Sequence, residues 1–395
     1  MTSRRQRLTF AVLVAFAVAG LLVVALQSSQ ARRSADFTID YSAALLIRQG
    51  HADAIYDRQQ LAPLMLRLSE NAIDPGLPFD APLALALPYV PLTFLPMELA
   101  LHLWQLITVG VLFLAVWLLG HWLPLSPRAP WLGLLAMLAF PATWSLLSEG
   151  QSSAMLMLGA ALLIGAWRYD RWLLGGAGGA LLAMKPQYIP VYLILLLAAR
   201  HWKALGGAVS AAFLIGLSPL LAGGIGGMAA MIWSALDAGQ RAIPYHESVI
   251  GMLAPLLPGA WAKDAAFGIW GIVLLTLTGV ALRWPMRGAV PPERRLSSAM
   301  AFTTAGVLFA PHALPYDLVL LAIPAWLTFA LYRGTSAAKP SIAWTIVGLV
   351  VLFDLHASIA PVAPIAIAGV VAWTLWGQRR GRDPRDQVEP LARAG

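Results

Sequence analysis

The chain has 395 residues, of which 59% are hydrophobic and only 12% charged, against roughly a quarter charged residues in an ordinary soluble domain. This composition excludes a soluble globular protein, because so much apolar surface could not be hidden from water. The net charge of +8 could indicate a nucleic-acid partner, but the basic residues lie in short segments between apolar runs, which is typical of membrane topology. The lack of cysteine excludes disulfides, thiolate metal sites and cysteine nucleophiles.

Apolar runs close to the roughly 20 residues that cross a bilayer as a helix recur along the whole chain. Breaking these runs at charges, prolines and glycines predicts about twelve spans. The predicted spans are residues 8–27, 97–123, 131–148, 152–167, 172–184, 188–199, 204–223, 265–282, 297–310, 316–332, 341–357 and 362–376. The expected fold class is all-α, a polytopic transmembrane helical bundle. The short runs 172–184 and 188–199 fit either short tilted helices or one broken hairpin.

The charges between the runs predict how the chain is oriented. With a cytoplasmic N-terminus, most lysines and arginines fall into inside segments, and most aspartates and glutamates fall on the outer side. This distribution follows the positive-inside rule. We therefore expect a multi-pass protein of the cell (inner) membrane with both termini cytoplasmic. A transmembrane domain is predicted over residues 1–378 and a basic cytoplasmic tail over residues 379–395.

Two of the predicted outer segments are long. Residues 28–96 are rich in aspartate and end in a proline-punctuated apolar stretch from Pro82 to Pro96. This pattern predicts helices that lie along the membrane surface. Residues 224–264 begin with glycines and then carry His246 and Glu247.

The first outer segment opens with two candidate catalytic carboxylates. Asp36 and Asp40 lie four residues apart, so on a helix they share one face and present carboxylates at the outer surface. The alternative is that they cap a helix or are hydrated among lipid headgroups. Either reading fits the sequence.

Lys185 is the candidate anion-binding residue. It lies between two apolar runs in Met184-Lys185-Pro186-Gln187, where an ammonium group would attract a phosphate. The alternative is a lysine that extends to the membrane interface without binding anything.

Other polar residues lie at the outer ends of predicted spans, where a functional reading competes with an ordinary interfacial one. They are Gln151, His246, Glu247, His312, Tyr316 and Asp317, with Glu149, Asp354 and His356 as further candidates. Together they could surround a polar headgroup. The chain has no G-x-x-x-x-G-K-[ST] loop, no H-E-x-x-H helix and no D-x-D pair, so ATP-driven, zinc-dependent and nucleotide-sugar chemistries are not expected.

Several short motifs follow one another in order along the chain. They are Asp36-Phe37-Thr38-Ile39-Asp40-Tyr41-Ser42-Ala43-Ala44, Gly50, Tyr56-Asp57, the stretch from Pro88 to Pro96, Gly150-Gln151, Lys185-Pro186-Gln187, Pro311 and Tyr316-Asp317-Leu318. In this order and placement, over roughly residues 36–320, the chain resembles glycosyltransferase family 87, which comprises GT-C-type membrane proteins similar to mannosyltransferases. It departs from the family at His246-Glu247-Ser248, where an Asn-Gln-Ser-like run is common, and near His312, where a paired histidine found in some members is lacking.

The resemblance implies an inverting glycosyltransferase that works on the non-cytoplasmic face. Nucleotide sugars are not available there, so the sugar, which the resemblance implies to be mannose, would come from a polyprenyl-phosphate carrier and pass to a lipid or glycan acceptor. Asp36 would be the general base, with Asp40 as its neighbour or substitute. Lys185, His246, His312 and Tyr316 would bind the donor phosphate, and Gln151, Glu247 and Asp317 the substrates. The resemblance implies neither a metal nor another cofactor.

Two other classes of protein also fit the sequence. A transporter or lipid flippase would also have about twelve spans with few buried charges, although no clear internal repeat is visible. The clustering of polar groups on one side favours the enzyme. A noncatalytic membrane scaffold is the third possibility, and in it substitutions at Asp36 and Lys185 should be silent.

Overall fold

The computed structural model describes residues 4–33, 35–123, 129–242, 247–253, 256–257, 259–283, 292–331, 338–354 and 362–380, and within these ranges the chain is helical, without strands. The first half contains α1 (Arg4–Ala25), α2 (Ser29–Arg33), α3 (Phe37–Arg48), η1 (Ala52–Ala54), α4 (Arg58–Ser69), α5 (Leu83–Ala86), η2 (Leu87–Phe94), α6 (Met97–Trp122), α7 (Ala129–Leu138), α8 (Pro141–Glu149), α9 (Ser153–Tyr169), α10 (Trp172–Leu182), η3 (Pro186–Tyr188) and α11 (Ile189–Ala199). The second half contains α12 (Trp202–Gly216), η4 (Ser218–Ala222), α13 (Gly224–Ala242), α14 (Val249–Leu253), α15 (Gly259–Arg283), α16 (Pro292–Leu308), η7 (Pro315–Leu321), α17 (Ala322–Leu331), α18 (Ala338–Asp354) and α19 (Ala363–Arg380).

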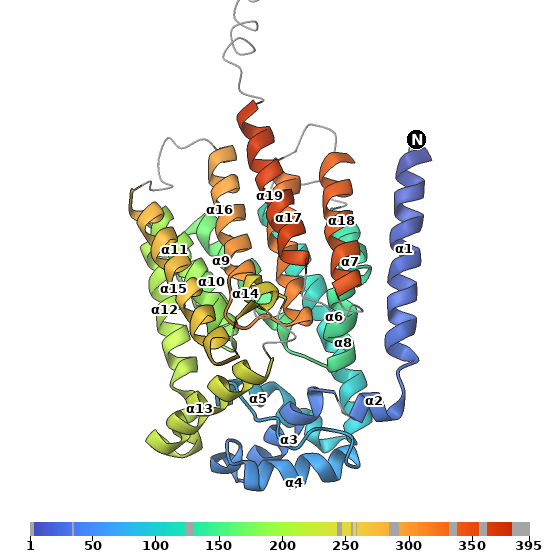
Figure 1. Cartoon of the computed structure of the whole chain (residues 1–395), viewed down its shortest axis with the longest axis vertical. Coiled ribbons are helices and arrows are strands. Elements are labelled where there is room, and N and C mark those ends of the chain that lie inside the picture. Colours follow the sequence, from blue (N-terminus) through green and yellow to red (C-terminus); the bar gives the residue numbers. More distant parts are fainter. Residues whose placement is uncertain are drawn as a thin grey trace, which may run out of the picture.

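The long helices form a bundle with different structures at its two ends. In Figure 1 the start of α1 and the end of α19 lie at one end, and α2 to α5 and α13 gather at the other. An ion pair between Arg58 of α4 and Asp237 of α13 joins two of these end helices. The predicted outer segment 28–96 is therefore a cap of short helices on one end of the bundle.

One helix of this cap differs from the prediction of helices lying along a surface. Residues Phe37 to Leu46 of α3 are all buried, because α4, α5 and η2 cover the helix. The Tyr41 hydroxyl donates to the Leu95 carbonyl oxygen at 2.8 Å, and the Arg48 guanidinium donates to the Thr93 carbonyl oxygen. These bonds fix α3 inside the cap, so residues at its start are held in defined positions.

Three helices of the described residues are long and apolar enough to cross a membrane. They cover Met97–Trp122, Trp202–Ala222 and Asp264–Arg283, and the bent pair Pro130–Leu138 and Pro141–Glu149 gives a fourth if it is counted as one span. Most of the other predicted spans coincide with apolar helices of 10–17 residues. The described residues are thus all-helical, with helices apolar enough to span a membrane, and the count of twelve spans stays a prediction.

The predicted span 131–148 is not one straight helix. It is divided into α7 and α8, which meet at an angle of 68°. Pro141 occupies the first turn of α8 and Phe140 before it is extended, because proline lacks an N–H group and keeps the preceding residue out of the helical region. The Trp144 indole donates to the Leu138 carbonyl oxygen at 2.7 Å, which satisfies a group left free at the break.

The short run 172–184 forms a continuous helix, α10, that packs closely against α12. A Cβ atom added to Gly175 would lie 2.1 Å from the Ala204 carbonyl oxygen, and one added to Gly179 would lie 2.5 Å from that of Ala208. Only glycine lets the two backbones come this close, as is common between helices in membranes. This packing fixes α10, whose end leads directly to Lys185.

Candidate active site

Asp36 lies at the start of α3, where the cap meets the bundle. It occupies the N-cap position, but its side chain makes no capping hydrogen bond. Instead, Oδ2 of Asp36 accepts hydrogen bonds from Gln151 Nε2 at 2.8 Å and from the Tyr316 hydroxyl at 3.1 Å. The alternative of an ordinary helix cap is therefore wrong for Asp36, whose carboxylate is bound by residues far away in the sequence.

The surroundings of Asp36 suit a proton acceptor. Burial raises the pKa of the Asp36 carboxyl above its usual value, while the hydrogen bonds from Gln151 and Tyr316 and the positive charge of Lys185 oppose this rise. A carboxylate whose basicity is raised and whose orientation is fixed is better placed to take a proton from a hydroxyl than an exposed aspartate is. Part of the Asp36 surface remains accessible.

Asp40 follows one helical turn later on the same helix, as predicted, but its environment differs. Its exposed fraction is only 7%. Burial raises the pKa of Asp40 to about 8, and the neighbouring carboxyl groups of Asp36 and Asp80 raise it further. Burial therefore favours the protonated form of Asp40 near neutral pH, which makes Asp40 a weaker candidate for the base than Asp36.

Lys185 is held by a buried carboxylate. Its Nζ lies 2.8 Å from Asp317 Oδ1, and 15% of the Lys185 side chain is exposed against 0% of the Asp317 side chain. Asp317 also accepts hydrogen bonds from Ser153, from the Tyr188 hydroxyl at 3.1 Å and from the Leu314 N–H at 3.3 Å. Lys185 is thus fixed within the protein, and the alternative of a lysine that merely reaches the interface is wrong.

The same contacts bear on the role of Asp317, which the resemblance assigns to substrate binding. Its carboxylate has no exposed surface and is surrounded by donors. Its geometry favours holding Lys185 over direct contact with a ligand.

Tyr316 connects the two halves of the site. Its hydroxyl donates to Asp36, and the Lys185 Nζ lies 4.5 Å from the centre of its ring, within the range of a cation–π contact. Asp36, Tyr316 and Lys185 therefore lie next to one another, although Asp36 and Tyr316 are 280 residues apart. A base and a cation are thus placed in one site.

His312 and Glu247 lie beside the segment that carries Tyr316. The carbonyl oxygen of His312 accepts from Gln187 Nε2 at 3.0 Å and from the Tyr188 hydroxyl at 3.3 Å. Burial and the charge of Lys185 lower the pKa of the His312 imidazole to about 4, so at neutral pH it can donate a hydrogen bond but supplies no charge.

The Glu247 N–H donates to the Ala313 carbonyl oxygen at 2.7 Å, and only 6% of Glu247 is exposed. Burial raises the pKa of Glu247 to about 8, and Asp354 contributes to the rise. The neighbouring His246, predicted to bind the donor phosphate, lies outside the described residues.

Two neighbours of Asp36 were missed or underrated. The Asp36 N–H donates to Glu149 Oε2 at 3.2 Å, although Glu149 was only a weak candidate. Desolvation raises the pKa of the Asp80 carboxyl to about 6, the positive charge of Lys185 opposes this rise, and the charge of Asp36 adds to it. Both residues have a signal in the sequence, because Asp80 lies just before the proline-punctuated stretch from Pro82 and Glu149 lies at the end of a predicted span.

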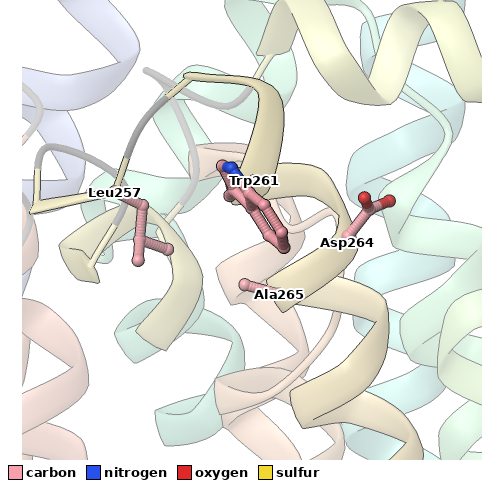
Figure 2. Close-up of a pocket in the computed structure, with 4 residues that line it drawn as sticks. All are labelled: Leu257, Trp261, Asp264 and Ala265. Carbon is pink, nitrogen blue, oxygen red and sulfur yellow. The ribbon is translucent and has the colours of Figure 1, made fainter.

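Two open pockets lie elsewhere. One, of about 510 Å³, is lined by Leu257, Trp261, Asp264 and Ala265 near the start of α15, and in Figure 2 the Trp261 ring stands between the Leu257 and Asp264 side chains. The other, of about 350 Å³, is lined by Asp53, Tyr56, Asp57, Ala222, Gly223, Gly226, Gly227 and Ala230. In the part of the chain that is described, no three His, Asp or Glu side chains are grouped to hold a metal ion.

The model of glycosyltransferase family 87 matches residues 81–315, which is more than half of the chain. No curated protein and no solved structure matches. The matched range includes Glu149, Gln151 and Lys185 but begins after Asp36 and ends just before Tyr316.

Proposed function

The chain belongs to glycosyltransferase family 87 and is a glycosyltransferase, and from this premise we propose that it transfers mannose from a polyprenyl-phosphate carrier to a lipid or glycan acceptor on the non-cytoplasmic side of the membrane. The observation that carries the proposal is the contact of Tyr316 with both Asp36 and Lys185. Glycosyl transfer from a phosphate needs a base for the acceptor and a cation for the leaving group, and these two residues meet that need.

The reaction is a single displacement. The acceptor hydroxyl oxygen attacks the anomeric carbon of the sugar, and its proton passes to the Asp36 carboxylate. The bond between the anomeric carbon and the phosphate oxygen breaks, and its electron pair stays on the phosphate. One displacement inverts the anomeric configuration, so a β-linked donor gives an α-linked product.

Lys185 stabilises the charge that develops on the leaving phosphate. An ammonium group has three N–H donors, and the described contact with Asp317 uses one of them. The remaining donors are available to phosphate oxygens, while the ion pair holds the Lys185 side chain in place. His312, neutral at pH 7, contributes at most a hydrogen bond. Because Lys185 supplies the positive charge, the proposed reaction needs no metal ion.

A lipid-linked donor fits the position of the site. Asp36 belongs to the cap of short helices, and the helices next to it are apolar enough for lipid. The start of α1 and the end of α19 lie at the opposite end of the bundle, and the basic segments predict that end to be cytoplasmic. The site then faces the outside, where a sugar carried by a membrane lipid is the available donor.

The test is a comparison of donors with the purified full-length protein. Three labelled donors are compared, each with a membrane lipid extract as acceptor. They are polyprenyl-phospho-mannose, a nucleotide-linked mannose and polyprenyl-phospho-glucose. The proposal expects product only with polyprenyl-phospho-mannose. Transfer from the nucleotide sugar would refute the assignment of a lipid-linked donor. Transfer of glucose alone would refute the assignment of mannose as the transferred sugar. A lipid flippase would move the donor across vesicles without forming product.

A further inference from the structure

We infer that the turn Glu149-Gly150-Gln151, called the 149–151 turn below, positions Asp36 and leaves Oδ1 of Asp36 as the oxygen that receives the acceptor proton. The inference rests on the proposed function, in which Asp36 is the base. It adds two positioning residues and names the reacting oxygen.

The 149–151 turn binds both the backbone and the side chain of Asp36. Glu149 Oε2 accepts the Asp36 N–H at 3.2 Å, and Gln151 Nε2 donates to Asp36 Oδ2 at 2.8 Å. A backbone and a carboxylate held from the same turn cannot easily shift relative to each other. The bend of 68° between α7 and α8 sets the direction of α8, whose last residue is Glu149.

Gly150 brings the turn into direct contact with the residue that follows Asp36. Its φ angle is +62°, and an added Cβ would lie 2.7 Å from Phe37 Cβ and 2.7 Å from Leu101 Cδ1. Glycine is favoured here because it adopts this conformation without strain and leaves room for Phe37. The packing therefore couples the position of the turn to the start of α3.

The side chains of Glu149 and Gln151 are not needed to end α8. The N–H of Gly150 donates to the Leu147 carbonyl oxygen at 3.3 Å, and that of Gln151 donates to the Leu146 carbonyl oxygen at 3.1 Å. With Gly150 in the left-handed region, these backbone bonds complete the end of the helix. The two side chains are thus available for Asp36.

The hydrogen bonds distinguish the two carboxylate oxygens of Asp36. Both side-chain donors, Gln151 and Tyr316, bind Oδ2. Among the contacts of the described residues, Oδ1 accepts no hydrogen bond, and Asp36 keeps accessible surface. An oxygen that is not stabilised by donors is the more basic one. Oδ1 is therefore the oxygen that takes the proton.

The first part of the test separates positioning by Glu149 from its charge. Glu149→Ala removes the acceptor for the Asp36 N–H, whereas Glu149→Gln keeps an oxygen in its place. We expect Glu149→Ala to lower kcat for mannose transfer by about 10- to 100-fold with the donor KM unchanged, because small misplacements of a reacting group have effects of this size. Glu149→Gln should stay within about threefold of wild type, since an amide oxygen still accepts.

Gln105→Ala is the matched control, because Gln105 Nε2 donates to the Leu147 carbonyl oxygen of α8 at 2.9 Å without any described contact to Asp36. It should leave kcat near the wild-type value. Equal activity of Glu149→Ala and Glu149→Gln, whether both are impaired or both normal, would overturn the positioning role.

The second part uses the pH profile. Gln151→Leu removes a donor that stabilises the ionised form of Asp36, so the acidic limb of kcat/KM should move to higher pH. A purely structural role would lower activity without moving the limb. If Asp36→Asn is inactive but the limb of Gln151→Leu stays in place, the role of Gln151 is refuted and the proposed function stands. If Asp36→Asn transfers as wild type does, the proposed base itself is refuted.

Discussion

The ion pair between Lys185 and Asp317 allows stability and catalysis to be separated. Lys185→Met removes the cation and leaves the Asp317 carboxylate, which has no exposed surface, without its counter-ion. Asp317→Asn removes the anion but keeps the shape of the side chain. The double variant removes both charges at once. If the two side chains form the observed ion pair, the losses of unfolding free energy caused by the two single substitutions are not additive.

The expected magnitudes follow from the burial of the two groups. Breaking a buried ion pair by removing one partner costs about 3–5 kcal/mol of unfolding free energy. We expect Lys185→Met to lie at the upper end, since Asp317 is fully buried, and Asp317→Asn at the lower end, since 15% of the Lys185 side chain is exposed. Without either charge, the double variant should lose only about 1–3 kcal/mol, which reflects imperfect hydrogen bonds to Ser153 and Tyr188.

The assay is denaturation by sodium dodecyl sulfate in mixed micelles for the wild type and the three variants, with mannose transfer measured on the same preparations. Stability should recover in the double variant, but transfer should stay about 10²- to 10³-fold below wild type, because the donor to the leaving phosphate is gone. Additive losses of stability in the double variant would refute the ion pair. Recovery of transfer would refute the role of Lys185.

Three further predictions concern groups around the site. Burial raises the pKa of Asp40 from 3.8 to about 8. The carboxyl therefore ionises at a lower pH in the unfolded chain than in the folded one, so the stability of the wild type falls between about pH 4 and pH 8. Asp40→Asn should flatten this fall when denaturation curves at pH 5 and pH 8 are compared. In a thermal unfolding assay, Gly150→Ala should cost about 1–3 kcal/mol of stability, and it should also lower kcat. In the control Gly110→Ala, no atom lies within 4 Å of the added Cβ, so this variant should be neutral or stabilising in that assay. Because burial raises the pKa of Glu247 to about 8, Glu247→Gln should match wild-type transfer at pH 7 and differ from it at pH 9; a large loss at pH 7 would show that the ionised form is needed.

Much of the fold is readable in the sequence because apolar runs and their breaks are local features. The runs 97–123 and 265–282 coincide with long helices, and the short run 172–184 with α10. The bend at Phe140 was missed because the run around it is apolar throughout, and a single proline does not distinguish a kink from a break. The burial of α3 was missed because it depends on helices that arrive from other parts of the chain.

Part of the candidate site is also readable in the sequence, because the ends of apolar runs are local features. Asp36, Lys185 and Tyr316 stand out as polar residues at the ends of apolar runs, and the structure brings them together. The ion pair of Lys185 spans 132 residues, and no periodicity or spacing reveals such a contact. The sequence therefore shows Asp317 only as a polar residue at the end of a span, and its burial against Lys185 appears only in the structure. Glu149 was underrated because its partner is a backbone N–H group, which has no sequence signal.

Asp36 takes the acceptor proton in the proposed reaction and Asp40 does not, so the two aspartates should differ in a direct rate measurement. Single-turnover transfer of labelled mannose from polyprenyl-phospho-mannose is followed at pH 7 for the wild type, Asp36→Asn and Asp40→Asn. We predict that Asp36→Asn loses about 10²- to 10⁴-fold in rate, the usual contribution of a general base, while Asp40→Asn stays within about tenfold of wild type because burial favours the neutral form of Asp40. A fast Asp36→Asn variant beside an inactive Asp40→Asn variant would contradict the account.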